Sequence, residues 1–94
     1  MKNHADARFL IITSPKARKT IQKLPEHYRR RIIELLLIIR ENPVPAEYYD
    51  IKKLKGYADT YRARIGDARV IYEILWNLKK VHVLLIEPRE SAYS

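Results

Sequence analysis

One stretch constrains the fold more than any other part of the chain: YRARIGDARVIYEI, from Tyr61 to Ile74. Two runs rich in β-branched and aromatic residues flank Gly66-Asp67, a pair that can supply the positive φ of a two-residue hairpin turn. So tight a turn decides which residues face each other across the two strands. The predicted pairs are Ile65 with Ala68, Arg64 with Arg69, Ala63 with Val70, Arg62 with Ile71, and Tyr61 with Tyr72.

This register sorts the hairpin into two faces, because strand residues alternate sides and opposed residues share a side. The face suited to a core contains Tyr61, Ala63, Ile65, Ala68, Val70 and Tyr72. The other face carries Arg62, Arg64 and Arg69. Like charges opposed across a ladder destabilise it by up to about 1 kcal/mol, so these guanidinium groups need a counter-charge. Glu73, diagonal to Arg62, can form one ion pair, whereas a polyanion across the sheet would neutralise them all, and we favour the polyanion.

The composition indicates what kind of protein this is and which partners it can bind. A chain of 94 residues with 47% hydrophobic content suits one domain, over residues 1–94, with a single core. The net charge of +8 favours nucleic acid, an acidic protein or an anionic membrane as partner. The absence of cysteine excludes disulfides and thiolate chemistry and fits a reducing compartment. No apolar run approaches the ~20 residues of a spanning helix, so we expect a cytoplasmic protein without membrane association.

The N-terminal part of the chain predicts a strand and a helix. Residues 1–7 are polar, and we expect them to be flexible. Residues 8–13, RFLIIT, form a β-rich run without alternation, which is typical of a strand covered on both faces. Ser14-Pro15 then supplies an N-cap followed by proline at the first helical position. A helix is therefore predicted from here to about Leu24.

A second helix is expected to begin near Pro25 and to end at Asn42-Pro43. Its core stripe consists of Tyr28, Ile32, Leu35, Leu36 and Ile39, which recur at helical spacing. Ile33, Leu37 and Ile38 fall outside that stripe. Either the helix makes a wide contact with the sheet, or a protein partner covers the remaining apolar surface.

Residues 43–57 are interpreted as a loop that carries a basic run. Lys52, Lys53 and Lys55 would enlarge the positive field near the hairpin, the alternative being an ordinary solvated run of charge. The last strand is expected over about Lys80 to Glu87, with apolar residues on both faces as in a central strand. The order β-α-α-β-β-β predicts an α+β fold in which a helical hairpin packs on a small, mainly antiparallel sheet.

Several kinds of site find no support in the sequence. Gly56 and Gly66 are too few for a phosphate-binding glycine loop, and the histidines lack metal-ligand spacing, so no metal or cofactor is expected. What remains is a basic surface interleaved with tyrosine, including Arg89 and Tyr93 in the tail of residues 88–94. Arginine binds phosphate bidentately and tyrosine stacks on unpaired bases, a combination that suits single-stranded RNA.

These motifs resemble the RelE branch of the RelE/ParE toxins of type II toxin–antitoxin systems. The resemblance rests on KLKG at 53–56, on the hairpin at 61–74 and on PRESAY at 88–93, and it covers nearly the whole chain from Arg8. It implies a metal-independent, ribosome-dependent mRNA endonuclease. Such an enzyme cuts codons in the ribosomal A site by driving the 2′-hydroxyl onto the adjacent phosphate, and so inhibits translation. It also implies a cognate antitoxin that holds the toxin inactive in a hetero-oligomer.

The resemblance implies roles for particular residues. Arg62 and Arg64 stand at two basic positions of the active face, and Arg69 stands where an arginine contacts the scissile phosphate. Arg89 takes the place of a proposed general acid, and Tyr93 that of a tyrosine that stacks on the nucleotide. Lys52, Lys53 and Lys55 are then expected to contact RNA or the ribosome.

Three departures from the family pattern affect these roles. Position 64 is an arginine, whereas some family members have a lysine there. Arginine is effectively never deprotonated, so Arg64 is assigned to charge stabilisation and the general base is left unnamed. Ala68 replaces an aromatic residue, and Glu90 follows Arg89. Two alternatives stay open: a non-catalytic toxin of the ParE branch, which inhibits DNA gyrase and generally lacks this arginine and tyrosine set, and an inactive RNA-binding relative.

Overall fold

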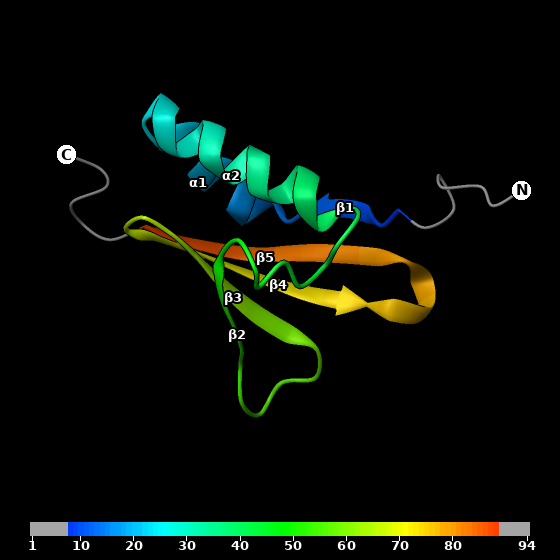
Figure 1. Ribbon diagram of the computed structural model, residues 1–94. Coiled ribbons are helices and arrows are strands. Elements are labelled where there is room, and N and C mark those ends of the chain that lie inside the picture. The colour runs from blue at the N-terminus through cyan, green and yellow to red at the C-terminus, as the bar shows by residue number, and fades with distance from the viewer. Residues whose placement is uncertain (1–7, 89–94) are drawn as a thin grey trace, which may run out of the picture.

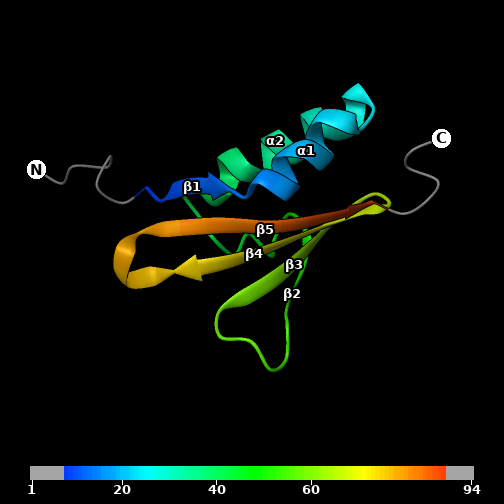
Figure 2. The same ribbon diagram turned by 180° about the vertical axis from the view of Figure 1, so that it is seen from behind.

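Two helices cover one face of a five-stranded sheet in the computed structural model, which describes residues 8–88 (Figure 1). The elements are β1 (Leu10–Thr13), α1 (Pro15–Lys23), α2 (Glu26–Ile39), β2 (Asp50–Lys53), β3 (Thr60–Ile65), β4 (Ala68–Leu75), the short 3-10 turn η2 (Trp76–Leu78) and β5 (Lys80–Pro88). The strand order is β1-β5-β4-β3-β2, with β1 parallel to β5 and the other pairs antiparallel. Figure 2 shows from behind that both helices lie on the same side. The predicted fold class is confirmed.

The predicted helix cap at Ser14 is present and also ties the helix to the sheet. Its hydroxyl oxygen accepts a hydrogen bond from the Ala17 N–H at 3.0 Å, and its O–H donates to the Leu84 carbonyl at 2.9 Å. A serine at this position satisfies one of the unpaired N–H groups of the first turn. The same side chain therefore begins α1 and fixes its position over β5.

The hairpin register is confirmed pair by pair, from Tyr61 opposite Tyr72 to Ile65 opposite Ala68. The turn depends on Gly66, which has a φ of +57°. A Cβ at this glycine would lie 3.2 Å from a ring carbon of Tyr28, so α2 packs directly over the turn. The glycine therefore serves both the backbone conformation and the contact with the helix.

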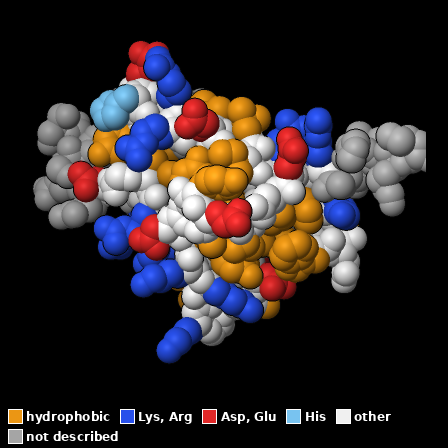
Figure 3. All heavy atoms as spheres, viewed as in Figure 1, with side chains coloured by type: hydrophobic (Ala, Val, Ile, Leu, Met, Phe, Trp, Pro, Cys, Tyr) orange, Lys and Arg blue, Asp and Glu red, His pale blue; other side chains and the backbone are white. Residues whose placement is uncertain are grey.

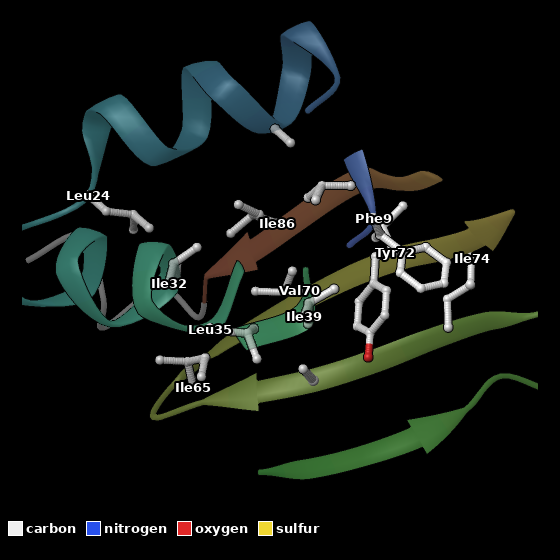
Figure 4. Packing of buried hydrophobic residues seen from close by; sticks show 14 residues of the cluster. Phe9, Leu24, Ile32, Leu35, Ile39, Ile65, Val70, Tyr72, Ile74 and Ile86 are labelled. Carbon is white, nitrogen blue, oxygen red and sulfur yellow. The ribbon is translucent and has the colours of Figure 1, made fainter. Parts of the chain in front are cut away.

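The core lies between α2 and the covered face of the sheet. Figure 4 shows Ile32, Leu35 and Ile39 of the helix beside Val70 and Tyr72 of β4. The Tyr72 hydroxyl donates a hydrogen bond of 2.7 Å to the carbonyl of Pro43. Burial raises the pKa of Tyr72 above its usual value of 10.0, and the neighbouring Tyr61 raises it further. The protonated phenol thus fastens the segment after α2 to the core.

Three sequence expectations about individual elements were wrong. The loop predicted over 43–57 contains β2, whose charged residues show no apolar alternation but whose backbone pairs with β3. The first strand is not covered on both faces, because both helices lie on one side of the sheet and leave Leu10 and Ile12 exposed on the other. The wide-contact alternative for α2 also fails, since Ile33 and Leu37 remain 49% and 54% exposed. Within residues 8–88, neither helix is long and apolar enough to cross a membrane.

We predict that Gly66→Ala lowers the free energy of unfolding by about 1–2 kcal/mol, because a left-handed conformation is unfavourable for a residue with a Cβ. The close approach of Tyr28 adds to that cost. Gly56→Ala is the matched control, since Gly56 also has a positive φ but has no neighbouring atom within 4 Å. Urea denaturation of both variants measures the difference. Equal losses would mean that the helix contact at the turn contributes nothing.

We predict that Tyr72→Phe destabilises the protein by about 1–2 kcal/mol at pH 7, because the buried Pro43 carbonyl loses its donor. The raised pKa means that the phenol stabilises the fold fully below the unfolded-state pKa of about 10 and progressively less as the pH rises above it. The gap between wild type and variant should therefore shrink above about pH 10. Urea titrations at pH 7 and in the alkaline range test this. Tyr48→Phe, at an exposed tyrosine, should change stability by no more than about 0.5 kcal/mol.

Candidate nucleic-acid interface

The face of the sheet opposite the helices carries the predicted arginines. Arg62 and Arg64 extend from β3 and Arg69 from β4, while their strand neighbours Ala63 and Val70 are buried toward the helices. Figure 3 shows several Lys and Arg side chains gathered on the side of the molecule where β2 and β3 lie. The predicted division of the hairpin into an apolar and a basic face is therefore confirmed.

Strand pairing arranges this open face in two rows that each cross β2, β3, β4 and β5. The first row, which we call the arginine row, is Asp50, Arg64, Arg69 and Glu87. The second row is Lys52, Arg62, Ile71 and Leu85. Because opposed residues share a face, a carboxylate stands at each end of the arginine row. The positive field is thus strongest in the middle of the sheet.

Asp50 supplies part of the counter-charge that the hairpin requires, because it lies near Arg62 and Arg64. Its carboxylate oxygens lie 3.7 Å from a terminal nitrogen of Arg62 and 3.8 Å from one of Arg64. At these distances the groups form ion pairs but no hydrogen bonds. Half-exposed ion pairs of this kind contribute no more than about 1 kcal/mol to the stability of the fold. Glu73, the other counter-ion considered, is diagonal to Arg62 as the register predicted, but within residues 8–88 it forms no ion pair with that arginine. Asp50 was missed because β2 was interpreted as a loop.

The three arginines differ in how firmly they are held. The side chain of Arg62 is 21% exposed and that of Arg64 is 47% exposed. Among the residues that the structure describes, Arg62 Nε is buried without a hydrogen-bond acceptor. Arg69 is exposed and forms no ion pair with any residue from 8 to 88. Arg69 therefore retains exposed donors for an incoming anion, whereas the unpaired Nε of Arg62 is buried and out of reach of one.

A shallow hollow of about 540 Å³ opens beside these arginines. Its lining includes Tyr57, Arg62, Arg69, Ile71, Leu85 and Glu87. This volume lies within the range of about 300–1,000 Å³ that small-molecule sites occupy. A second hollow of about 500 Å³ lies near η2, where Asp59 and Glu73 are its charged lining residues. A negatively charged ligand therefore suits the first hollow and is disfavoured in the second.

The predicted lysines do not form one group. Lys52 shares the open face with Arg62, its register partner. Lys53 pairs with Tyr61 and so faces the other side of the sheet, while Lys55 is exposed in the connection after β2. Arg89 and Tyr93 lie outside the described residues. The last described residue, Pro88, stands opposite Ala68 and so brings the end of β5 next to the arginine row.

Sequence inspection missed Asp50, Tyr57 and Glu87. Counting back through the β2–β3 connection would have placed Asp50 opposite Arg64, had β2 been recognised as a strand. No such count would have placed Glu87, because a register irregularity at Ile71/Tyr72 separates it from the rest of the β4–β5 ladder. Across residues 8–88, no cluster of His, Asp and Glu side chains is arranged to hold a metal ion.

Comparison with known proteins places this chain in a family. The family model of the ParE toxin of type II toxin–antitoxin systems, parDE, matches residues 11–93. A protein of Methanocaldococcus jannaschii named "Putative toxin RelE1" is 36% identical over 86 residues, which are 92% of this chain and 96% of that protein.

Solved structures agree with the sequence comparison. The RelE chain of the archaeal RelE–RelB complex from Pyrococcus horikoshii OT3 superposes with a TM-score of 0.80 and 38% identity, over 90% of this chain and 99% of that chain. The intact Escherichia coli RelBE toxin–antitoxin complex contains a chain with a TM-score of 0.74 at 21% identity, over 87% and 98% of the two chains, which shows the shared fold alone. On the matched family model and the archaeal relatives, this chain belongs to the RelE/ParE family of toxins from type II toxin–antitoxin systems.

Proposed function

We propose that this toxin is a ribosome-dependent mRNA endonuclease that cleaves codons in the A site and so inhibits translation. The supporting observation is the arginine row, in which Arg64 and Arg69 are opposed on an open face with Arg62 in the next row. Two guanidinium groups opposed across a ladder repel each other unless an anion lies over them. A phosphate group supplies that anion and accepts bidentate hydrogen bonds from arginine.

The proposed reaction is an attack by the ribose 2′-oxygen on the adjacent phosphorus. The 2′-hydroxyl gives its proton to a base, the P–O bond to the 5′-oxygen breaks, and that oxygen takes up a proton. Negative charge accumulates on the phosphate oxygens between these events. Guanidinium groups already aimed at that position can lower the barrier by several kcal/mol, about 10²–10³-fold for a single donor.

The roles of the arginines follow from their chemistry. Arg69 is exposed and outside the described ion pairs, so it binds the scissile phosphate most directly. Arg62 and Arg64 add charge stabilisation, and none of the three serves as the base because arginine does not deprotonate. Arg89 and Tyr93 keep the proposed roles of general acid and stacking residue. No metal and no cofactor take part in this scheme.

Asp50 is proposed to act as an exchangeable counter-ion. Its loose contacts with Arg62 and Arg64, 3.7 Å and 3.8 Å long, cost little to break when a phosphate arrives. Lys52, on the same face, would add attraction for the RNA or the ribosome, and Lys55 could do so from the β2–β3 connection. Lys53, on the other side of the sheet, is a weaker candidate for the same contact.

We infer that a cognate antitoxin completes the assembly in the cytoplasm. The P. horikoshii relative was solved as a RelE–RelB complex, and a second archaeal structure, from Methanococcus jannaschii, is an antitoxin–toxin complex at 25% identity and a TM-score of 0.73. Ile33 and Leu37 of α2 leave apolar surface that the sheet does not cover. Exposed apolar patches on small proteins usually mark interfaces. An apolar segment of the antitoxin would cover them.

A second candidate follows from the family model, which is that of ParE toxins. On this alternative the chain would bind DNA gyrase without cleaving RNA. The arginine row and its hollow favour the endonuclease, because a protein contact alone would not require opposed guanidinium groups. An inactive RNA-binding relative would share the surface but leave message uncut.

We predict that Arg69→Ala lowers cleavage of ribosome-bound mRNA by about 100-fold or more, because the developing phosphorane charge loses its most exposed guanidinium. Toeprinting of a translated message measures both the extent and the position of cleavage. Arg18→Ala, an exposed arginine on α1, is the matched control and should cleave normally. Unchanged cleavage by folded Arg69→Ala would refute the assignment, and gyrase inhibition with intact message would favour the ParE alternative.

We predict that Asp50→Asn tightens binding to single-stranded RNA by up to about fivefold, because the phosphate no longer competes with a carboxylate for Arg62 and Arg64. The same change should lower the free energy of unfolding by no more than about 1 kcal/mol. Fluorescence anisotropy and urea denaturation provide the two measurements. Glu41→Gln changes the net charge equally at an exposed position after α2, and it should leave the affinity nearly unchanged.

A further inference from the structure

The hollow beside the arginine row has two chemically different ends. At one end Arg69 and Glu87 face each other in the register of β4 and β5. In the next row Ile71 and Leu85 form an apolar floor, which leads toward Tyr57 in the β2–β3 connection. A ligand that is charged at one end and flat or apolar at the other therefore suits this hollow.

Tyr57 is an unusual residue to find at such a rim. Its side chain is 66% exposed, and within residues 8–88 its ring makes no contact with another aromatic ring. An exposed aromatic ring beside a basic surface is the feature that nucleic-acid proteins use as a stacking platform. A single exposed tyrosine is common on protein surfaces and does not by itself indicate a function. Tyr57, however, lies at the rim of a hollow that is also lined by Arg62 and Arg69, which points to a binding role.

The segment that carries Tyr57 is braced rather than loose. At its start the Leu54 N–H donates to the Thr60 carbonyl at 2.8 Å, and the Thr60 hydroxyl donates to the Ala58 carbonyl at 2.9 Å. At its end the Ile74 N–H of β4 donates to the carbonyl of Asp59 at 2.9 Å. These bonds fix the backbone on both sides of Tyr57, at residue 54 and at residues 58–60, to β3 and β4. Ordering the backbone in this way reduces the conformational freedom that is lost when a ligand stacks on the ring.

We infer that the hollow is a subsite for one unpaired nucleobase of the RNA, with Tyr57 as its stacking platform and Ile71 and Leu85 as its floor. This inference rests on the proposed function, because Arg62 and Arg69 must hold the adjoining phosphate. Glu87 stands beside Arg69 and repels the phosphate from that edge, so the strand runs from the arginines toward Tyr57. Tyr57 is thus a positioning residue, since it sets which nucleotide the arginines meet.

The test separates base contacts from phosphate contacts. Binding of a short single-stranded RNA and of an abasic strand of the same length is measured by fluorescence anisotropy at one salt concentration. Tyr57→Ala should weaken RNA binding by about five- to one-hundred-fold, the range for loss of one stacked base, and should change abasic binding less than about twofold. Tyr57→Phe and Tyr57→Trp should both retain RNA binding, because each keeps an aromatic face. Their binding also tests whether position 57 tolerates substitution.

Two controls complete the design. Tyr48→Ala removes another exposed tyrosine, 72% exposed, that does not line the hollow, and it should leave both affinities unchanged. Arg69→Ala should weaken binding of the RNA and of the abasic strand together, because it acts on phosphate.

The outcomes distinguish the base subsite from the arginine site. If Tyr57→Ala leaves RNA binding intact, or weakens both strands equally, the base subsite is wrong while the arginine site stands. If the wild-type protein binds neither strand, the base subsite is overturned, while the arginine site is decided by the cleavage of ribosome-bound message by Arg69→Ala.

Discussion

The pairing of β3 with β4 around Gly66 is the constraint on which the other features depend. A shift of the register by one residue would move the arginines into the core and the core residues into solvent. The turn needs the left-handed conformation of Gly66, and the absence of a Cβ there lets α2 approach. The same short segment thus orients the arginine-bearing face, contributes residues to the core and contacts the helix that covers it.

The open face combines strong positive charge with weak internal neutralisation. Asp50 contacts two arginines at distances that bind loosely, and the described part of the chain offers Arg69 no ion pair. Such a surface stays folded without RNA because water screens the half-exposed guanidinium groups. On the proposed function, phosphate binding requires little to be broken first. Binding and charge stabilisation would then be the part of these arginines, and the proton transfers would need other groups, on the tail, the RNA or the ribosome.

The two sides of the molecule offer different chemistry. The helix side exposes Ile33 and Leu37, and the sheet side exposes the arginine row and the hollow near Tyr57. On the proposed function, an antitoxin segment on α2 and an RNA strand on the sheet would use separate surfaces. An antitoxin could still block the RNA by covering part of the sheet, by neutralising its charge, or by making the toxin too bulky for the ribosome.

The sequence by itself determined the hairpin register, the N-cap of α1, the fold class and the gathering of Arg62, Arg64 and Arg69, because all of these follow from local rules of turn geometry and periodicity. Only the tertiary structure showed that residues 50–53 form the strand β2, because its backbone pairs with β3 while its side chains lack the alternating pattern of a strand. The pairing of β2 also places Asp50 near the arginines and puts Lys52 and Lys53 on opposite faces of the sheet. The irregularity in the β4–β5 ladder and the braced β2–β3 connection likewise placed Glu87 and Tyr57 beside the arginines. These contacts join residues far apart in the chain, and no local pattern encodes such distances.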